Sequence, residues 1–236
     1  MEISGSRVLV TGANRGLGRH LTAELVARGA YVYAATRKPE AIDIPEAVPL
    51  ALDIADSSSV ALAASKATDI TILINNAGSS TGADLLNSSM DNIRLEMETH
   101  YFGTLSVVRA FAPIIVSNGG GSVLNILSVL SWITSPRVGA YAAAKSAEWS
   151  MTNALRMQLA PHGVRIAGLH VGYMDTDMTA SVKAPKTDPA RVAKLAVDGI
   201  EDELSEIVVD ERSRQVQAAL AGGVAALYPS SSNSGR

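Results

Sequence analysis

Tyr141 and Lys145 lie four residues apart within residues 140–145, and Ser128 precedes the tyrosine by 13 residues. Four residues make about one helical turn, so a helix would present the phenol and the ammonium on the same face. A lysine beside a tyrosine favours the phenolate, which brings a weak acid with a pKa of about 10 closer to a working pH. Such a pair could exchange a proton with a carbonyl or alcohol oxygen.

A glycine-rich turn near the N-terminus follows a short apolar run. The run, residues 7–11, predicts a buried strand, and Gly12, Gly16 and Gly18 lead directly into a helical pattern. Glycines let the backbone approach a pyrophosphate, and the N-terminus of the helix offers free N–H groups to the phosphates. The spacing differs from the generic Gly-x-Gly-x-x-Gly fingerprint, and a plain strand-to-helix turn would use the same residues.

These motifs and several others occur in an order that resembles one family. The matching pieces are residues 11–18, Asp53-Ile54, Asn75-Asn76-Ala77-Gly78, Ser128, Tyr141 with Lys145, and Gly172 followed by Thr176. The chain resembles a short-chain dehydrogenase/reductase of the ordinary, single-domain subclass over roughly residues 6 to 180. The glycine spacing also resembles this subclass, in contrast to the longer sugar-nucleotide-modifying relatives.

Apolar runs alternate with helical patterns along the chain. They predict strands near 7–11, 30–36, 47–52, 70–75, 121–127, 164–171 and 205–210, and helices near 16–28, 57–66, 88–117, 141–160, 174–181, 188–201 and 211–221. The alternation, with strands apolar on both faces, indicates an α/β protein of the Rossmann type. We expect a doubly wound parallel sheet of about seven strands with helices on both faces. Ligands would then bind at the carboxyl ends of the strands, where the motifs lie.

The composition agrees with an ordinary enzyme domain. The 236 residues, 47% of them hydrophobic, predict one domain over 1–228, and the polar segment 229–236 is expected to be disordered. The net charge of −3 disfavours nucleic acid as a partner, and the lack of cysteine excludes disulfides and thiolate metal sites. The four histidines show no ligand spacing, so we expect no metal. The first strand leaves no room for a signal peptide and no stretch could span a membrane, which predicts a cytoplasmic protein.

The second predicted strand indicates which cofactor is used. An acidic residue usually meets the free 2′-hydroxyl of NAD(H) about 20 residues after the glycine turn. Here the strand ends in Thr36, Arg37 and Lys38, with no acid at that place. Arg37, with Arg15 in the glycine turn, could contact a 2′-phosphate through charge-assisted hydrogen bonds, which favours NADP(H). Both arginines could also be ordinary surface charges.

The resemblance implies further cofactor contacts. Asp53 would accept the adenine amino group with Ile54 against the ring, although Asp53 could instead be a helix cap. Small residues would let the ribose pass close to the backbone, and the loop after the sixth strand would meet the nicotinamide carboxamide. The complete set expected to bind the cofactor is Gly12, Asn14, Arg15, Gly16, Leu17, Gly18, Thr36, Arg37, Asp53, Ile54, Asn76, Ala77, Gly78, Tyr141, Lys145, Gly172, Met174 and Thr176.

For the chemistry, the resemblance implies Tyr141 as the acid/base and Ser128 as the donor that orients the carbonyl. Lys145 would lower the pKa of Tyr141 and bind the ribose. Ser131 is a competing serine, but its spacing from the tyrosine does not fit the family. His100 stands where the family usually has asparagine, and it could hold a water that links Lys145 to solvent or make a packed polar contact.

The residues beside these positions suggest the substrate. Leu130, Trp132, Tyr173 and Met178 are expected to line the cleft, which favours a mostly apolar ketone or aldehyde. Trp132 could instead pack in the core or at a subunit contact.

Three functions compete at this point. The first is an NADPH-dependent carbonyl reductase that acts by reversible hydride transfer. The second is a non-catalytic NADP-sensing regulator on the same fold, which an intact Ser-Tyr-Lys set disfavours. The third is a sugar epimerase or dehydratase, but the chain lacks their extra substrate domain. The resemblance also implies a homodimer or homotetramer, formed through the helices expected at 88–117 and 141–160.

Overall fold

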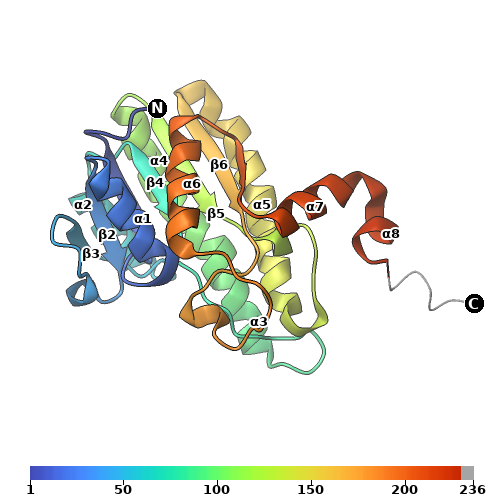
Figure 1. Cartoon of the computed structure of the whole chain (residues 1–236). Coiled ribbons are helices and arrows are strands. Elements are labelled where there is room, and N and C mark those ends of the chain that lie inside the picture. Colours follow the sequence, from blue (N-terminus) through green and yellow to red (C-terminus); the bar gives the residue numbers. More distant parts are fainter. Residues whose placement is uncertain (230–236) are drawn as a thin grey trace, which may run out of the picture.

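Seven parallel strands form one sheet in the order β3-β2-β1-β4-β5-β6-β7 in a computed structural model that describes residues 1–229 (Figure 1). The strands are β1 (Arg7–Thr11), β2 (Tyr31–Thr36), β3 (Val48–Ala51), β4 (Ile72–Asn75), β5 (Gly121–Ile126), β6 (Val164–His170) and β7 (Glu206–Val208). Every neighbouring pair is parallel. This arrangement confirms the predicted doubly wound Rossmann-type fold.

Helices cover both faces of the sheet (Figure 1). On one face α1 (Gly16–Ala27) packs against α6 (Pro189–Glu201). On the other face lie α2 (Ser57–Lys66), α4 (Thr104–Ser117) and α5 (Gly139–Leu159). Among residues 1–229, none of the helices combines the length and the hydrophobicity of a membrane span.

The strands divide their side chains between two apolar cores. Ile72 and Ile74 of β4 belong to the core under α1 and α6, whereas Leu73 belongs to the core on the opposite face. All three are fully buried. Because successive side chains of a strand point to opposite faces, a strand covered on both sides has to be apolar throughout. Each such side chain contributes about 1.5–3 kcal/mol of hydrophobic stabilisation, which explains why short apolar runs located these strands.

Side-chain caps start most of the longer helices. Asp56, Ser89, Asp188 and Asp210 accept hydrogen bonds from backbone N–H groups in the first turns of α2, α3 (Met90–Met97), α6 and α7 (Glu211–Ala219). Asp56 therefore caps α2, and Asp53 does not. The helices α1, α4 and α5 have no such cap. At α1, whose N-cap residue is Arg15, the first N–H groups are left for another partner.

Three helix predictions need correction. Residues 174–181 form a loop with one 3₁₀ turn at Asp177–Thr179, because Met174 is held by a β-bridge to Thr187. The helix expected at 88–117 divides into α3, a π-helical segment Glu98–Gly103 and α4. After α7, a 3₁₀ turn leads into an additional helix, α8 (Gly223–Leu227), which projects away from the sheet (Figure 1). The tail expected at 229–236 lies outside the described residues except for Pro229.

Candidate functional site

The candidate site lies at the carboxyl edge of the sheet, where Thr11 joins the ends of β1 and β4. The Thr11 hydroxyl accepts hydrogen bonds from the backbone N–H groups of Asn76 and Ala77, both at 3.0 Å. The Asn76 amide donates in return to the Thr11 carbonyl at 2.9 Å. This exchange fixes the segment Asn76-Ala77-Gly78 beside the glycine turn, where the resemblance requires it.

The glycine turn can accept only glycine at two of its three positions. A Cβ on Gly18 would lie 2.1 Å from the Gly12 carbonyl oxygen, and one on Gly12 would lie 2.9 Å from the Ala77 Cα. Gly12 also has a φ of +66°, in the left-handed region. The close packing brings the uncapped start of α1 to the edge of the sheet. Free N–H groups and the positive end of the helix dipole there suit a pyrophosphate, so the residues present fit a dinucleotide cofactor.

The residues proposed to bind the adenosine half lie at the ends of β2 and β3. Thr36 is buried, whereas Arg37 is exposed and makes no ion pair with any residue in the described part of the chain. Arg15 is exposed as well, and its guanidinium lies 3.6 Å from Asp177. Asp53 accepts from the Ala55 N–H at 3.0 Å through one carboxylate oxygen, and the second oxygen accepts no hydrogen bond from residues 1–229.

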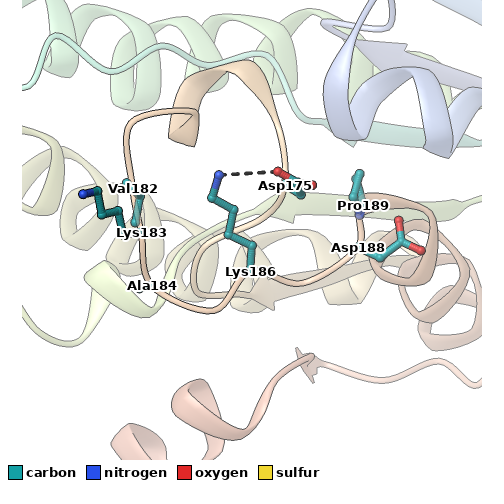
Figure 2. A pocket seen from close by; sticks show the side chains of 7 residues that line it. All are labelled: Asp175, Val182, Lys183, Ala184, Lys186, Asp188 and Pro189. Atoms are coloured by element: carbon teal, nitrogen blue, oxygen red, sulfur yellow. Dashed lines mark hydrogen bonds and ion pairs between the residues drawn. The ribbon is translucent and has the colours of Figure 1, made fainter.

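The loop after β6 lies next to the glycine turn. A Cβ on Gly16 would be 3.5 Å from the Thr176 methyl group, and the Gly172 N–H donates to Asp210 at 2.6 Å. A cavity of about 530 Å³ is lined by residues of this loop and the start of α6, and Lys186 reaches Asp175 there at 3.4 Å (Figure 2). Its lining includes none of Ser128, Tyr141 or Lys145.

Ser128 is the second residue after β5 and the N-cap of a 3₁₀ turn, Val129–Ser131. Its hydroxyl accepts from the Leu130 N–H at 3.1 Å and keeps its own proton for donation. The Ser131 hydroxyl is buried and accepts from the Ser128 N–H at 3.2 Å. Ser131 thus supports the turn, whereas Ser128 is the serine that acts on Tyr141: burial raises the pKa of the phenol, and the Ser128 hydroxyl opposes part of that rise.

Tyr141 and Lys145 lie one turn apart near the start of α5. The Lys145 ammonium lies 5.9 Å from the centre of the Tyr141 ring. It donates to the Ile126 carbonyl at 2.8 Å and to Glu148 at 2.6 Å. Glu148 was not foreseen, because a single glutamate in a helix usually marks a solvated face. Here its side chain is only 2% exposed.

The charges around Tyr141 work against one another. Burial raises the pKa of the phenol, Lys145 lowers it, and Glu148 raises it again, so the pKa of Tyr141 stays above its ordinary value. Lys145 lowers the pKa of Tyr141 as expected, but burial and Glu148 outweigh its effect. Burial would lower the pKa of Lys145, yet Glu148 and then Tyr141 raise it above the ordinary value. Lys145 is therefore held as a cation.

His100 lies in the π-helical segment and packs edge-on against Tyr141, with 5.0 Å between the ring centres. Its Nε2 donates to the Ser79 carbonyl at 2.7 Å and lies 3.5 Å from Glu96. Its Nδ1 has no hydrogen-bond partner among residues 1–229. Nδ1 is the nitrogen left for the proposed water contact, and Glu96 is a second buried carboxylate that the pattern did not reveal.

The residues proposed to line the substrate cleft differ in accessibility. Tyr173 is 44% exposed and Met178 51% exposed, and Leu130 is half-buried. Trp132 is only 8% exposed because its indole ring stacks on the His170 ring, with 3.7 Å between the ring centres. It also packs edge-on against the ring of Trp149. The structure therefore shows internal packing for Trp132, which was the alternative reading, and leaves the other three as candidates.

Fold and site together define a protein of the dinucleotide-binding Rossmann class. The chain belongs to the short chain dehydrogenase family, whose model matches residues 6–187. It is similar to gluconate 5-dehydrogenase of Gluconobacter oxydans, with 31% identity over 88% of this chain and 86% of the relative. It is also similar to carbonyl reductase [NADPH] 2 of Sus scrofa, with 28% identity over 83% and 81%.

Solved structures agree with the fold. A short chain dehydrogenase from Burkholderia cenocepacia, in complex with NADP, superposes with a TM-score of 0.93 at 39% identity over 97% of this chain and 98% of that one. A Burkholderia phymatum relative in complex with NAD has a TM-score of 0.85 at 21% identity, which shows the fold alone. The chain spans 60% of dehydrogenase/reductase SDR family protein 7-like of Drosophila melanogaster and 65% of the uncharacterized oxidoreductase YusZ of Bacillus subtilis.

Proposed function

We propose that the chain is an NADPH-dependent carbonyl reductase that interconverts a ketone or aldehyde and its alcohol. The observation that carries the proposal is the arrangement of Ser128, Tyr141 and Lys145 on the edge of the sheet that also holds the glycine turn. The hydroxyl donor lies at the turn that follows β5, the proton donor and the fixed cation lie on α5, and α5 packs against both this turn and β6. The residues needed for proton transfer thus share one rigid frame.

The chain's own groups divide the work of a reduction. A reduced nicotinamide would supply the hydride when bound. Ser128 would donate a hydrogen bond to the carbonyl oxygen and so orient and polarise it. Tyr141 would give its phenolic proton to the same oxygen as the alcohol forms, and in the reverse direction it would take that proton back. Lys145 would stabilise the phenolate that remains.

NADPH is favoured by the charges at the adenosine end. Arg37 is exposed at the end of β2, Arg15 stands at the start of α1, and no acid is among the first three residues after β2. A 2′-phosphate between two guanidinium groups would form charge-assisted hydrogen bonds. The similar structure from Burkholderia cenocepacia was solved with NADP, which supports the same choice.

A mostly apolar carbonyl compound is the substrate class that the lining favours. Tyr173 and Met178 expose large apolar surfaces beside the loop that follows β6, and Leu130 lies beside Ser128. Apolar walls with a few polar groups at the reacting atom are typical of small-molecule sites. We place the chain in the cytoplasm as a homodimer or homotetramer, on the family resemblance.

The test is loss of the nicotinamide absorbance of NADPH with a panel of alkyl and aryl ketones, aldehydes, keto sugars and acyl groups on a carrier protein. Turnover of the alkyl or aryl compounds is expected. Cofactor binding without turnover of any compound would indicate a sensing role and reject the enzyme. Turnover confined to the sugars or the carrier-bound acyl groups would reject the apolar substrate class.

A further inference from the structure

Glu148 holds the Lys145 ammonium inside the protein. The two side chains lie one turn apart on α5, are both buried, and meet at 2.6 Å. The turn that carries Glu148 is itself fixed, because its backbone carbonyl accepts from Thr152 at 2.7 Å. Thr152 in turn accepts from the Asn125 amide of β5 at 2.8 Å. Lys145 is therefore tied to β5 twice, directly through Ile126 and indirectly through this chain of bonds.

Charged or titratable groups lie around Tyr141 on each of the elements packed against it. Lys145 and Glu148 come from α5, Glu96 comes from α3, and His100 comes from the π-helical segment. From β6, His170 bonds to the Ser128 carbonyl, and burial lowers its pKa to about 4, so it is neutral at and above neutral pH. The set holds one fixed cation beside two buried carboxylates.

Glu148 changes what Lys145 can do to Tyr141. An uncompensated ammonium next to a phenol would stabilise the phenolate in a site of low dielectric. A carboxylate on the same ammonium cancels most of that field at the phenol, and its own charge opposes ionisation. The cation still anchors its hydrogen-bond partners, but its pull on the Tyr141 proton is weakened.

Resting on the proposed function, we infer that Glu148 is a positioning residue that fixes Lys145 and offsets its charge. Tyr141 thereby remains a protonated acid into the alkaline range, and carbonyl reduction keeps its kcat/KM to a higher pH than it would without Glu148. Reduction needs the phenol as a proton donor, so its rate falls as Tyr141 ionises. Oxidation needs the phenolate as a base.

The experiment is a pH titration of Tyr141 by carbon NMR on the full chain, with ring-labelled tyrosine and no added cofactor. Tyr141→Phe identifies the signal.

In Glu148→Gln the midpoint of the Tyr141 titration is expected to move to lower pH, which raises the phenolate fraction at least about threefold at a pH on the rising limb. Glu148→Asp keeps the charge and should titrate close to the parent. Glu206→Gln serves as the matched control, since this carboxylate contacts Trp149 and Gln217 instead of Lys145.

With a substrate in hand, the alkaline limb of the kcat/KM profile for reduction should move to lower pH in Glu148→Gln and stay in place in Glu148→Asp. An unmoved or raised midpoint in Glu148→Gln, or an equal shift in Glu206→Gln, would overturn the inference. Glu148→Ala repeats the test if Glu148→Gln does not fold, and loss of folding in both would make Glu148 a purely structural residue. Because the titration needs no turnover, failure of the proposed function and failure of this inference give different results.

Discussion

The guanidinium of Arg15 lies 3.6 Å from the carboxylate of Asp177, so an ion pair joins the glycine turn to the loop after β6. Both side chains are more than two-thirds exposed, and such a pair contributes about 0–1 kcal/mol. Arg15 can therefore leave Asp177 for a 2′-phosphate at little cost. Arg37 has no such partner in the described part of the chain and is the simpler residue to test.

Arg37→Asp should reverse the proposed cofactor choice. In the parent chain we expect kcat/KM with NADPH to exceed that with NADH at least about tenfold, or about 1.4 kcal/mol. The variant places a carboxylate where the 2′-phosphate would lie, so NADPH is repelled and the 2′-hydroxyl of NADH gains an acceptor. Arg212→Asp, an equal charge change at an exposed position on α7, should leave the ratio unchanged. Equal efficiencies with both cofactors in the parent would end this part of the proposal.

Thr11→Val should destabilise the chain and weaken cofactor binding. The substitution keeps the shape but removes the acceptor for two backbone N–H groups, those of Asn76 and Ala77. Unsatisfied N–H groups cost about 1–3 kcal/mol, which urea unfolding would measure. Thr11→Ser keeps the hydroxyl and should behave nearly as the parent does. If valine and serine were equally stable, the bond between β1 and β4 would have no energetic role.

Much of the fold was readable because the strands are short, apolar on both faces and bounded by turn residues. The loop at 174–181 was misread as a helix because its apolar and polar residues have helical spacing. The β-bridge between Met174 and Thr187 overrides that local pattern. The π-helical segment was not distinguished because it continues from α3 into α4 without a break, and α8 is too short to leave a periodic pattern.

The site was readable where the spacing is dictated by chemistry, as for Tyr141 and Lys145. It was not readable where tertiary packing sets the environment. Glu148 and Glu96 look like surface glutamates in the sequence, and both are buried against the site. Their effect on Tyr141 is also tertiary, since the expected lowering of its pKa by Lys145 is outweighed by burial and by Glu148.

His100→Asn tests the role proposed for the histidine beside Tyr141. An imidazole can order a water as asparagine can. The variant should therefore stay within a fewfold of the parent in kcat, whereas His100→Phe, which keeps a ring against Tyr141 but cannot bind a water, should lose much of the activity. Retained kcat in His100→Phe would contradict the water contact and leave His100 with a packing role, such as the bond from Nε2 to Ser79.

His170 should make the chain sensitive to acid. Burial lowers its pKa from 6.5 to about 4, so the unfolded chain binds this proton more readily than the folded one. The stability it contributes is present above pH 6.5 and is lost as the pH falls through about 4. The loss amounts to about 3 kcal/mol. In His170→Gln the free energy of unfolding should vary less over this range, whereas His162→Gln, at an exposed position, should follow the parent. Parallel curves for parent and His170→Gln would contradict the assignment.

Tyr141→Phe measures the central claim most directly, because it deletes one hydroxyl and little volume. NADPH affinity, followed by fluorescence, should change by no more than a fewfold. The kcat for ketone reduction should fall by about two orders of magnitude or more, since the proton donor is gone. Ser131→Ala, which alters a buried supporting hydroxyl, is the control and should retain most of the activity. Turnover within a fewfold of the parent in Tyr141→Phe would place the acid elsewhere and contradict the account.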